Sequence, residues 1–265
     1  MQLAGSVDLF APQSAAVLVL FGTRMTGLIL IAPVFSSTAV PVTVRTAVLI
    51  VLTVLLQPVA LAHAAPNAAV TPATMISELL VGFAIGLGAA IFVGAAEAAG
   101  DLIAIQIGLS GAALLDPLNN TQAPVLATLT QMMAVSLMLA LNGHIAIIES
   151  LSASTQAIPV GASLNMPNGI AAIVSLGGSL FAMGLRFAAP VIATVLIANA
   201  ALAVLSRAAP QLNVLALAFP IQIGLGLFAL AASLPYIAAY FINWQTDYDV
   251  MLTTVFRALA VPGGR

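Results

Sequence analysis

The chain has 265 residues, of which 62% are hydrophobic and 5% charged, and its formal net charge is −2. A water-soluble domain carries about a quarter charged residues, so lipid or other apolar protein must surround most of this chain. Six arginines, with no lysine, provide no basic patch for nucleic acid. The sequence contains no cysteine, which excludes disulfides and thiolate metal sites. We therefore expect an all-α integral membrane protein that binds no metal, cofactor or nucleic acid.

Six apolar runs reach the roughly 20 residues that a membrane-spanning helix needs. They cover about residues 15–34, 46–62, 75–99, 124–148, 170–205 and 212–242. The fifth run is too long for one straight span and contains Arg186 and Pro190. The last run contains Pro220 and Pro235, so kinks are expected in both. The prediction is one membrane domain, residues 1–265, of about six long and partly kinked helices arranged in hairpins.

Glycines are concentrated in the third apolar run. Gly82, Gly86 and Gly94 recur along the predicted helix, with Gly88 between them. Such a small-residue surface lets another helix approach closely. Two interpretations are open: packing inside this chain's own helical bundle, or packing against partner subunits. Periodicity alone does not distinguish them.

Residues 106–122 interrupt the apolar pattern in the middle of the chain. Gly108 and Gly111 precede the pair Asp116–Pro117 and two asparagines, which is strong turn chemistry. The stretch is too apolar for a long solvated linker and too broken for a helix. Irregular backbone at membrane depth survives only where protein buries it or where it lines a wet cavity. We expect a re-entrant, plug-like loop; the alternative is a short interfacial connection with a frayed helix end.

Two arginines, Arg24 and Arg186, lie within predicted spanning helices, where an arginine must face protein or water. Glu97 and Asp101 lie four residues apart on one helical face. They repel each other unless one faces water, pairs with arginine or takes up a proton. We expect buried pairing of the arginines with Glu78, Glu97 or Asp101. A proton relay is the alternative, although few carboxylates occupy mid-helix positions that would support it.

Two other functions are considered from the residues. The string Gly108-Leu109-Ser110-Gly111, with His144 on a later helix, resembles the nucleophile motif of an intramembrane serine protease. Such a motif is common in a glycine-rich chain, and His144 is better explained as a structural hydrogen-bonding residue near a helix end. A stand-alone secondary transporter would show broken helices at matching positions in its two halves. The sequence shows one broken region, at residues 106–123.

Several polar stretches match the pattern of a known family. Near the start the chain reads RMTGLILIAPVFSSTAVPVTVR, with an arginine, an Ala-Pro step and a Pro-to-Arg turn. Mid-chain, GLSGAALLDPLNNTQAPVL is followed by LALNGHIAIIESL, and LSRAAPQLNVLALAFPIQIGLGL joins the last two apolar runs. Together these stretches resemble the FliR family of flagellar and type III secretion export-gate proteins, over most of the chain. The methionines of TQMMAVSLML depart from the phenylalanine and leucine expected there.

The resemblance implies a multi-pass subunit of a ring-like assembly in the bacterial cell inner membrane, in the flagellar basal body. It implies FliP, FliQ and FlhB-type export-gate proteins as partners, membrane lipid around them, and unfolded flagellar proteins as exported substrates. Residues 1–170 would be FliP-like, residues 171–245 a FliQ-like helical hairpin, and residues 246–265 a short tail. No catalytic residue or cofactor is implied, so we do not expect an enzyme. The overall pattern is closer to the flagellar branch than to the injectisome.

Within such an assembly we expect residues 106–122 to plug the central export pore. Small residues would let the loop fold tightly, and apolar residues would resist wetting. The expected plug residues are Gln106, Gly108, Ser110, Gly111, Leu114, Leu115, Asp116, Pro117 and Asn119. The expected subunit contact or hairpin turn consists of Arg207, Pro210, Gln211 and Asn213. For any one of these four residues, a role in a plain helix C-cap and turn is an equally good interpretation.

Overall fold

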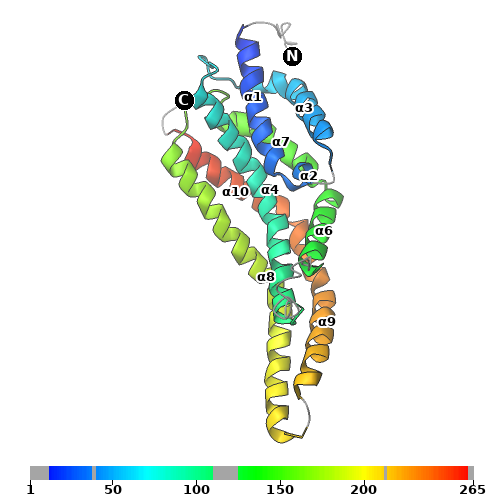
Figure 1. Ribbon diagram of the computed structural model, residues 1–265. Helices are drawn as coiled ribbons and strands as arrows, with labels where there is room; N and C mark the ends of the chain where they lie inside the picture. Colours follow the sequence, from blue (N-terminus) through cyan, green and yellow to red (C-terminus); the bar gives the residue numbers. More distant parts are fainter. Residues whose placement is uncertain (1–11, 38–39, 110–124, 212–213, 262–265) are drawn as a thin grey trace, which may run out of the picture. The chain divides into compact units, whose positions relative to one another are not determined.

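The computed structural model describes residues 12–37, 40–109, 125–211 and 214–261 (Figure 1). The helices are α1 (Pro12–Ile31), α2 (Pro33–Ser36), α3 (Val42–Ala62), α4 (Pro72–Gln106), α6 (Val125–Ala140), α7 (Gly143–Ala157), α8 (Met166–Ala208), α9 (Val214–Ile242) and α10 (Trp244–Leu259). In these ranges there is no strand, only an isolated bridge between Ala64 and Val160. Five helices are long and apolar enough to cross a membrane, or six spans if α6 and α7 form one broken span. The predicted all-α membrane protein with about six long apolar helices is confirmed.

The fourth predicted span differs from the prediction. A continuous helix was expected over residues 124–148, but α6 ends at Ala140 and α7 begins at Gly143. Asn142 between them has a positive φ of 59°. Asparagine is one of the few residues besides glycine that readily adopts this left-handed conformation, through which a right-handed helix does not continue. The prediction of one continuous helix here is wrong.

The C-terminal residues 246–265, expected as a short tail, contain most of an additional helix, α10. Its buried side chains recur at helical spacing: Tyr248, Leu252, Val255, Phe256 and Leu259. Acidic side chains occupy other faces, among them the exposed Asp247 and Asp249. The helix is therefore amphipathic, and it is shorter than the helices that could cross a membrane.

The described helices divide into two compact units. The first comprises Met1–Ile91, Asn142–Gly177 and Gln245–Arg265, and α1 and α4 lie side by side in it (Figure 1). Their backbones touch, because a Cβ on Gly82 would overlap the carbonyl oxygen of Arg24 and one on Gly27 would overlap that of Leu79. A Cβ on Gly86 would lie 2.8 Å from the carbonyl oxygen of Leu28. These glycines of α4 therefore serve packing within the chain, the first of the two interpretations above.

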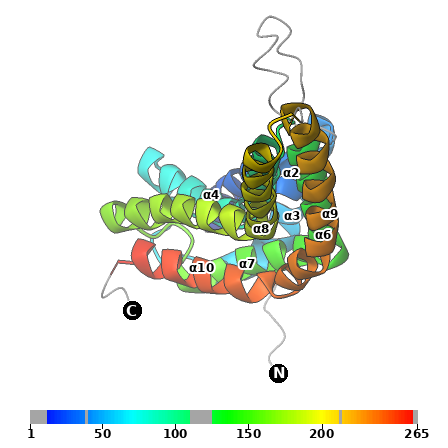
Figure 2. The ribbon, with the colours of Figure 1, turned by 90° about the horizontal axis from the view of Figure 1, so that it is seen from below.

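The second unit comprises Phe92–Leu141 and Gly178–Trp244. Its main feature is the hairpin of α8 and α9, which run side by side in both views (yellow and orange in Figures 1 and 2). Phe187 of α8 meets Tyr240 edge-on, with ring centroids 5.0 Å apart, and stacks on Phe241 at 6.0 Å. The C-terminal part of α4 crosses α6 closely, because a Cβ on Gly100 would overlap the hydroxyl oxygen of Thr130.

Candidate functional site

A buried ion pair lies in the core of the first unit. Arg24 of α1 is 0% exposed, and its Nε donates to Oε2 of Glu78 in α4 over 2.6 Å. Its Nη1 donates to the hydroxyl oxygen of Ser154 in α7 over 2.9 Å. Its Nη2 donates to the carbonyl oxygen of Ile158 over 3.1 Å. The arginine therefore fastens α1 to α4, to α7 and to the segment that follows α7.

The second oxygen of Glu78 extends this cluster. Oε1 accepts the backbone N–H of Gly161 over 2.7 Å. Gly161 has φ +84°, a conformation that favours glycine. We call Arg24, Glu78, Ser154, Ile158 and Gly161 the Arg24 cluster. Each carboxylate oxygen of Glu78 accepts a hydrogen bond, and the side chains of Arg24 and Glu78 are buried. This is the geometry of a structural ion pair.

The other charged residues singled out from the sequence lie in the second unit. Glu97 is partly buried, and its Oε2 accepts the Nε2–H of Gln131 in α6 over 2.8 Å. Asp101, one turn later on α4, is exposed. Arg186 on α8 is also exposed and forms no ion pair with any described residue. Pairing of Asp101 or Arg186 with a buried opposite charge stays a prediction.

The expected plug loop follows directly from the end of α4. Gln106, the last residue of α4, is partly exposed. Gly108 has φ +82°, its N–H donates to Ile105 O, and the N–H of Leu109 donates to Ala104 O. This is the Schellman arrangement, in which a left-handed glycine closes a helix. The left-handed glycine therefore explains, from the local sequence, why α4 ends at Gln106.

The start of this loop is held against α9. Ile107 is 0% exposed, and a Cβ on Gly226 of α9 would overlap its side chain. A Cβ on Gly108 would lie 3.2 Å from the ring of Phe219. The neighbouring Gln222 donates its amide N–H to Oδ1 of Asn199 in α8. The entrance to the loop is thus fixed on the α8–α9 hairpin.

Most of the expected plug residues lie outside the described residues: Ser110, Gly111, Leu114, Leu115, Asp116, Pro117 and Asn119. The separation of Ser110 and His144 that a protease would need is therefore not described. His144 is partly exposed near the start of α7. Its buried Nδ1 has no hydrogen-bond partner among the described residues, so the structural hydrogen bond expected for it is not seen.

The expected hairpin turn joins α8 to α9. Arg207 lies in the last turn of α8, where a positive charge interacts favourably with the helix dipole. Arg207, Pro210 and Gln211 are all exposed, and Asn213 lies outside the described residues. Their placement fits a turn; contact with a neighbouring subunit stays a prediction.

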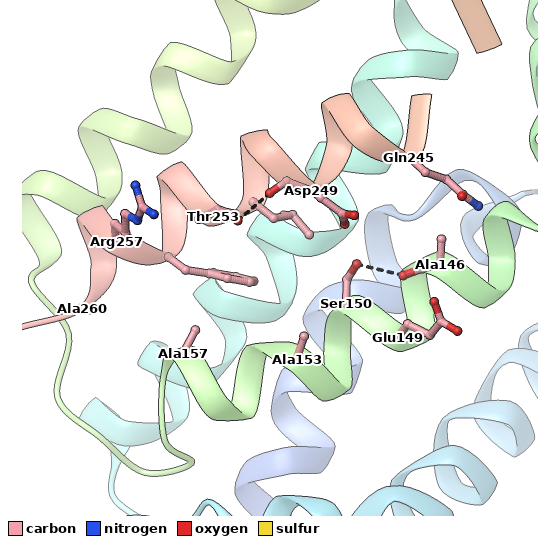
Figure 3. Close-up of a pocket in the computed structure, with 12 residues that line it drawn as sticks. Ala146, Glu149, Ser150, Ala153, Ala157, Gln245, Asp249, Thr253, Arg257 and Ala260 are labelled. Carbon is pink, nitrogen blue, oxygen red and sulfur yellow. Dashed lines mark hydrogen bonds between the residues drawn. The ribbon is translucent and has the colours of Figure 1, made fainter. Parts of the chain in front are cut away.

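A groove between α7 and α10 was not predicted from the sequence. The two helices run alongside each other in Figure 2, and the groove has a volume of about 640 Å³. Glu149 and Asp249 lie toward one end and Arg257 toward the other (Figure 3). Burial, followed by the charge of Glu149, raises the pKa of Asp249. The helical spacing of apolar residues in α10 was a sequence signal that could have revealed this element.

Tyr248 fixes α10 within the first unit. Its hydroxyl donates to the backbone oxygen of Ile85 in α4 over 3.1 Å, and its ring is 0% exposed. Burial is the main cause that raises the pKa of this phenol above its usual range. A Cβ on Gly88 would lie 3.0 Å from the same ring. After Gly82 and Gly86, a third glycine of the third apolar run is therefore used inside the chain.

These features define the class of protein: a multi-pass, all-α membrane protein with a buried ion pair, a long helical hairpin and a glycine-closed helix before its central loop. Residues 15–246 match the family model of bacterial export proteins, family 1. The chain is 32% identical over 218 residues to flagellar biosynthetic protein FliR of Escherichia coli (strain K12), covering 82% of this chain and 84% of the relative. The same protein of Caulobacter vibrioides (strain ATCC 19089 / CIP 103742 / CB 15) is 27% identical over 236 residues, covering 86% and 91%. The chain belongs to the FliR family of bacterial export proteins.

Proposed function

We propose that this protein is a subunit of the flagellar protein export gate in the bacterial inner membrane. Its role there is to help form the central pore and to seal it between export events. Unfolded flagellar proteins are the cargo. Two findings support the proposal: membership of an export-protein family, and relatives that carry the name flagellar biosynthetic protein.

The observation that carries the sealing role is the fixed base of the central loop. The left-handed Gly108 closes α4, and Ile107 is locked against Gly226 of α9. A plug needs such a base, because a loop attached to a loose helix end would not return to one place after displacement. The base is buried and closely packed. The following stretch is rich in glycine, serine and alanine. Small residues in this stretch would let a passing chain displace it at low cost.

The residues of the loop suggest how it would seal. Leu114 and Leu115 would form a dry constriction, which resists wetting and so resists ions. Asp116, next to Pro117, would accept local backbone N–H groups and fix a turn. A passing unfolded chain would displace the loop. We propose no catalytic role for this subunit.

Partner proteins follow from the same proposal. Residues 1–170 would take a FliP-like place and residues 171–245 a FliQ-like place, in contact with FliP, FliQ and FlhB-type subunits. The α8–α9 hairpin supports this, because it exposes large apolar side chains such as Phe181 (75%) and Phe228 (71%). Such surfaces need lipid or protein around them. The boundary proposed at residues 170/171 does not coincide with the boundaries of the two compact units. It rests on resemblance to the partner proteins, whereas the units are defined by contacts within this chain.

Deletion of residues 110–117 tests the sealing role. The deletion keeps Gly108 and the base of the loop, so the subunit should still co-purify with its partners. We expect the cell membrane to become leaky to small ions when the assembled gate is present. A correctly assembled deletion gate with unchanged ion permeability would rule out the plug.

A further inference from the structure

We propose that the groove between α7 and α10 binds a phospholipid whose head group carries a primary ammonium, phosphatidylethanolamine being the simplest. The ammonium lies against Glu149 and Asp249, and the phosphate lies against Arg257. An acyl chain follows the apolar floor of the groove. No residue that lines the groove belongs to the expected plug, so the site does not depend on the export role.

Small side chains on α7 create the space in the groove. Ala146, Ala153 and Ala157 line it on the same side of the helix as Glu149 and Ser150. A large side chain at any of the three alanine positions would project into the groove and fill part of it. The volume of about 640 Å³ lies in the range of about 300–1,000 Å³ that ligand pockets occupy. The groove is therefore large enough for a head group and part of an acyl chain.

Apolar side chains of α10 form the floor of the groove. Leu252 is 3% and Phe256 is 8% exposed, and both line it. Tyr248, one turn before Leu252, fixes the position of this helix through its hydrogen bond to Ile85 O. Apolar surface at the floor of an open groove favours an occupant that contains hydrocarbon, because contact removes that surface from water.

The charges of the groove have no counter-charge in the part of the chain that the structure describes. Glu149, Asp249 and Arg257 form no ion pair with any described residue. Asp249 and Arg257 share one face of α10, two turns apart, with Thr253 between them. Two turns correspond to about 12 Å along the helix axis, and the long arginine side chain can shorten the gap between the charges. A head group with an ammonium at one end and a phosphate at the other complements this arrangement.

The acidic end indicates that the ammonium is primary. A primary ammonium has three N–H donors for the carboxylates of Glu149 and Asp249, whereas a quaternary ammonium has none. Burial and the charge of Glu149 raise the pKa of Asp249, which is the effect of an acidic pair without a counter-charge. A bound ammonium supplies that charge. At the other end, the planar guanidinium of Arg257 suits the oxygens of a phosphate, to which it can donate two hydrogen bonds.

The surroundings of the groove favour a lipid over a soluble molecule. The long apolar helices of the chain require a membrane, but the charges of the groove exclude it from the hydrocarbon layer. An amphipathic helix too short to span, such as α10, is typical of the membrane interface, where head groups are concentrated. Val250, next to Asp249, is 62% exposed, and Ile145, next to Ala146, is 45% exposed. These side chains offer apolar contacts to acyl chains beside the groove.

Lipid titration of the full chain in mild detergent, followed by native mass spectrometry, tests the ligand. With matched acyl chains, phosphatidylethanolamine should bind at least about tenfold more tightly than phosphatidylcholine or phosphatidylglycerol, because neither has ammonium N–H donors. Free phosphoethanolamine, which is the head group without the chains, should compete only weakly. Equal binding of the three lipids, or equally tight binding of the free head group, overturns the proposal.

Variants of the charged residues test the position of the site. Asp249→Asn and Arg257→Gln should each weaken binding of phosphatidylethanolamine about tenfold or more, and Arg257→Lys should retain part of it. Asp247→Asn is the matched control, because Asp247 is an exposed aspartate of α10 that does not line the groove. Added phosphatidylethanolamine should raise the melting temperature of the parent and of Asp247→Asn, but not of Asp249→Asn. Full binding by Asp249→Asn or Arg257→Gln, or an equal loss in Asp247→Asn, overturns the proposal.

Photo-cross-linking in cells tests the occupant in the assembled state. A photoreactive residue at Ala153, in the full chain with its partners, should form an adduct with phosphatidylethanolamine. The control is the same residue at Thr246, which is exposed on α10 outside the groove and should form less of this adduct. An adduct of Ala153 with another protein and none with lipid would make the groove a protein interface and overturn the lipid site. As much lipid adduct at Thr246 as at Ala153 would overturn it too.

Discussion

Arg24 and Glu78, 54 positions apart in the chain, are joined by a 2.6 Å ion pair whose side chains are at most 2% exposed. Their meeting depends on the backbone contact of α1 and α4 at Gly27 and Gly82. The pair also holds Ser154, Ile158 and Gly161. One pair of charges therefore sets the arrangement of three helices and of the segment after α7.

Removal of the arginine should be strongly destabilising. Arg24→Met leaves Glu78 buried without its counter-charge, and breaking a buried pair in this way costs about 3–5 kcal/mol. Arg257→Met is the matched control, because Arg257 is exposed. Thermal unfolding of the purified protein in detergent should show a large loss for Arg24→Met and a small change for Arg257→Met. Equal melting temperatures would contradict a structural role for the pair.

Gly82→Ala, which adds one methyl group, should disturb the packing of α1 against α4 and destabilise the protein. Its Cβ would overlap the backbone of Arg24, and overpacking of this kind costs about 1–3 kcal/mol. Gly224 of α9 is a helical glycine with nothing within 4 Å of an added Cβ. Gly224→Ala should therefore be neutral or stabilising by up to about 1 kcal/mol. The prediction fails if both variants shift the unfolding midpoint in the same direction.

The sequence predicted the long helices from their apolar runs, and it predicted that the regular pattern breaks from residue 106, where α4 ends, because glycine and turn residues follow. The apolar run itself was placed only as far as about residue 99. It missed the break at Asn142 because the residues around it are equally apolar on both sides. The Asn142–Gly143 dipeptide, a known turn signal, was the available clue. It missed α10 because that helix is amphipathic, and a search for uniformly apolar runs does not detect a 3.6-residue stripe.

The partner of Arg24 was left open among three carboxylates for a physical reason. Charge and spacing do not rank Glu78 above Glu97 or Asp101, since all three lie in, or within two residues of, the same apolar run at residues 75–99. Only the tertiary contact at Gly82 brings the Glu78 turn of α4 to Arg24. The α7–α10 groove is likewise formed by segments about a hundred residues apart, which no local pattern connects.

The hydroxyl of Tyr248 should contribute measurably to the position of α10. Tyr248→Phe removes the donor to Ile85 O and the side-chain contact of the hydroxyl with Ser150, and loss of one hydrogen bond costs about 1 kcal/mol. Tyr236, which is 56% exposed, is the matched control, and Tyr236→Phe should change stability little. Each variant lacks one hydroxyl oxygen, so comparison of their unfolding midpoints isolates the contribution of the buried hydroxyl. If Tyr248→Phe lowers the unfolding midpoint no more than Tyr236→Phe does, the buried hydroxyl does not stabilise the fold.

The groove should make stability depend on pH in a defined direction. Burial and Glu149 raise the pKa of Asp249 in the folded protein, so folding favours the protonated carboxyl. The stabilisation is complete below the unfolded-state pKa, about 3.9, and is lost as pH rises through the higher folded-state pKa. Asp249 is exposed, so solvent screening keeps the effect small.

Asp249→Asn should therefore raise the melting temperature at neutral pH and have little effect near pH 4. Glu149→Gln should produce part of the same gain, because it removes the neighbouring charge. Melting curves of the three proteins across this pH range provide the measurement. Parallel pH dependence for the parent and Asp249→Asn would show that Asp249 is not the titrating group.

The most direct test of the central claim is the conductance of the purified export assembly in a planar lipid bilayer, with and without residues 110–117 of this subunit. The intact assembly should stay closed to small ions, and the assembly with the shortened loop should show stable open-channel currents. If both assemblies contain all subunits and both remain closed, the loop after Gly108 is not the seal.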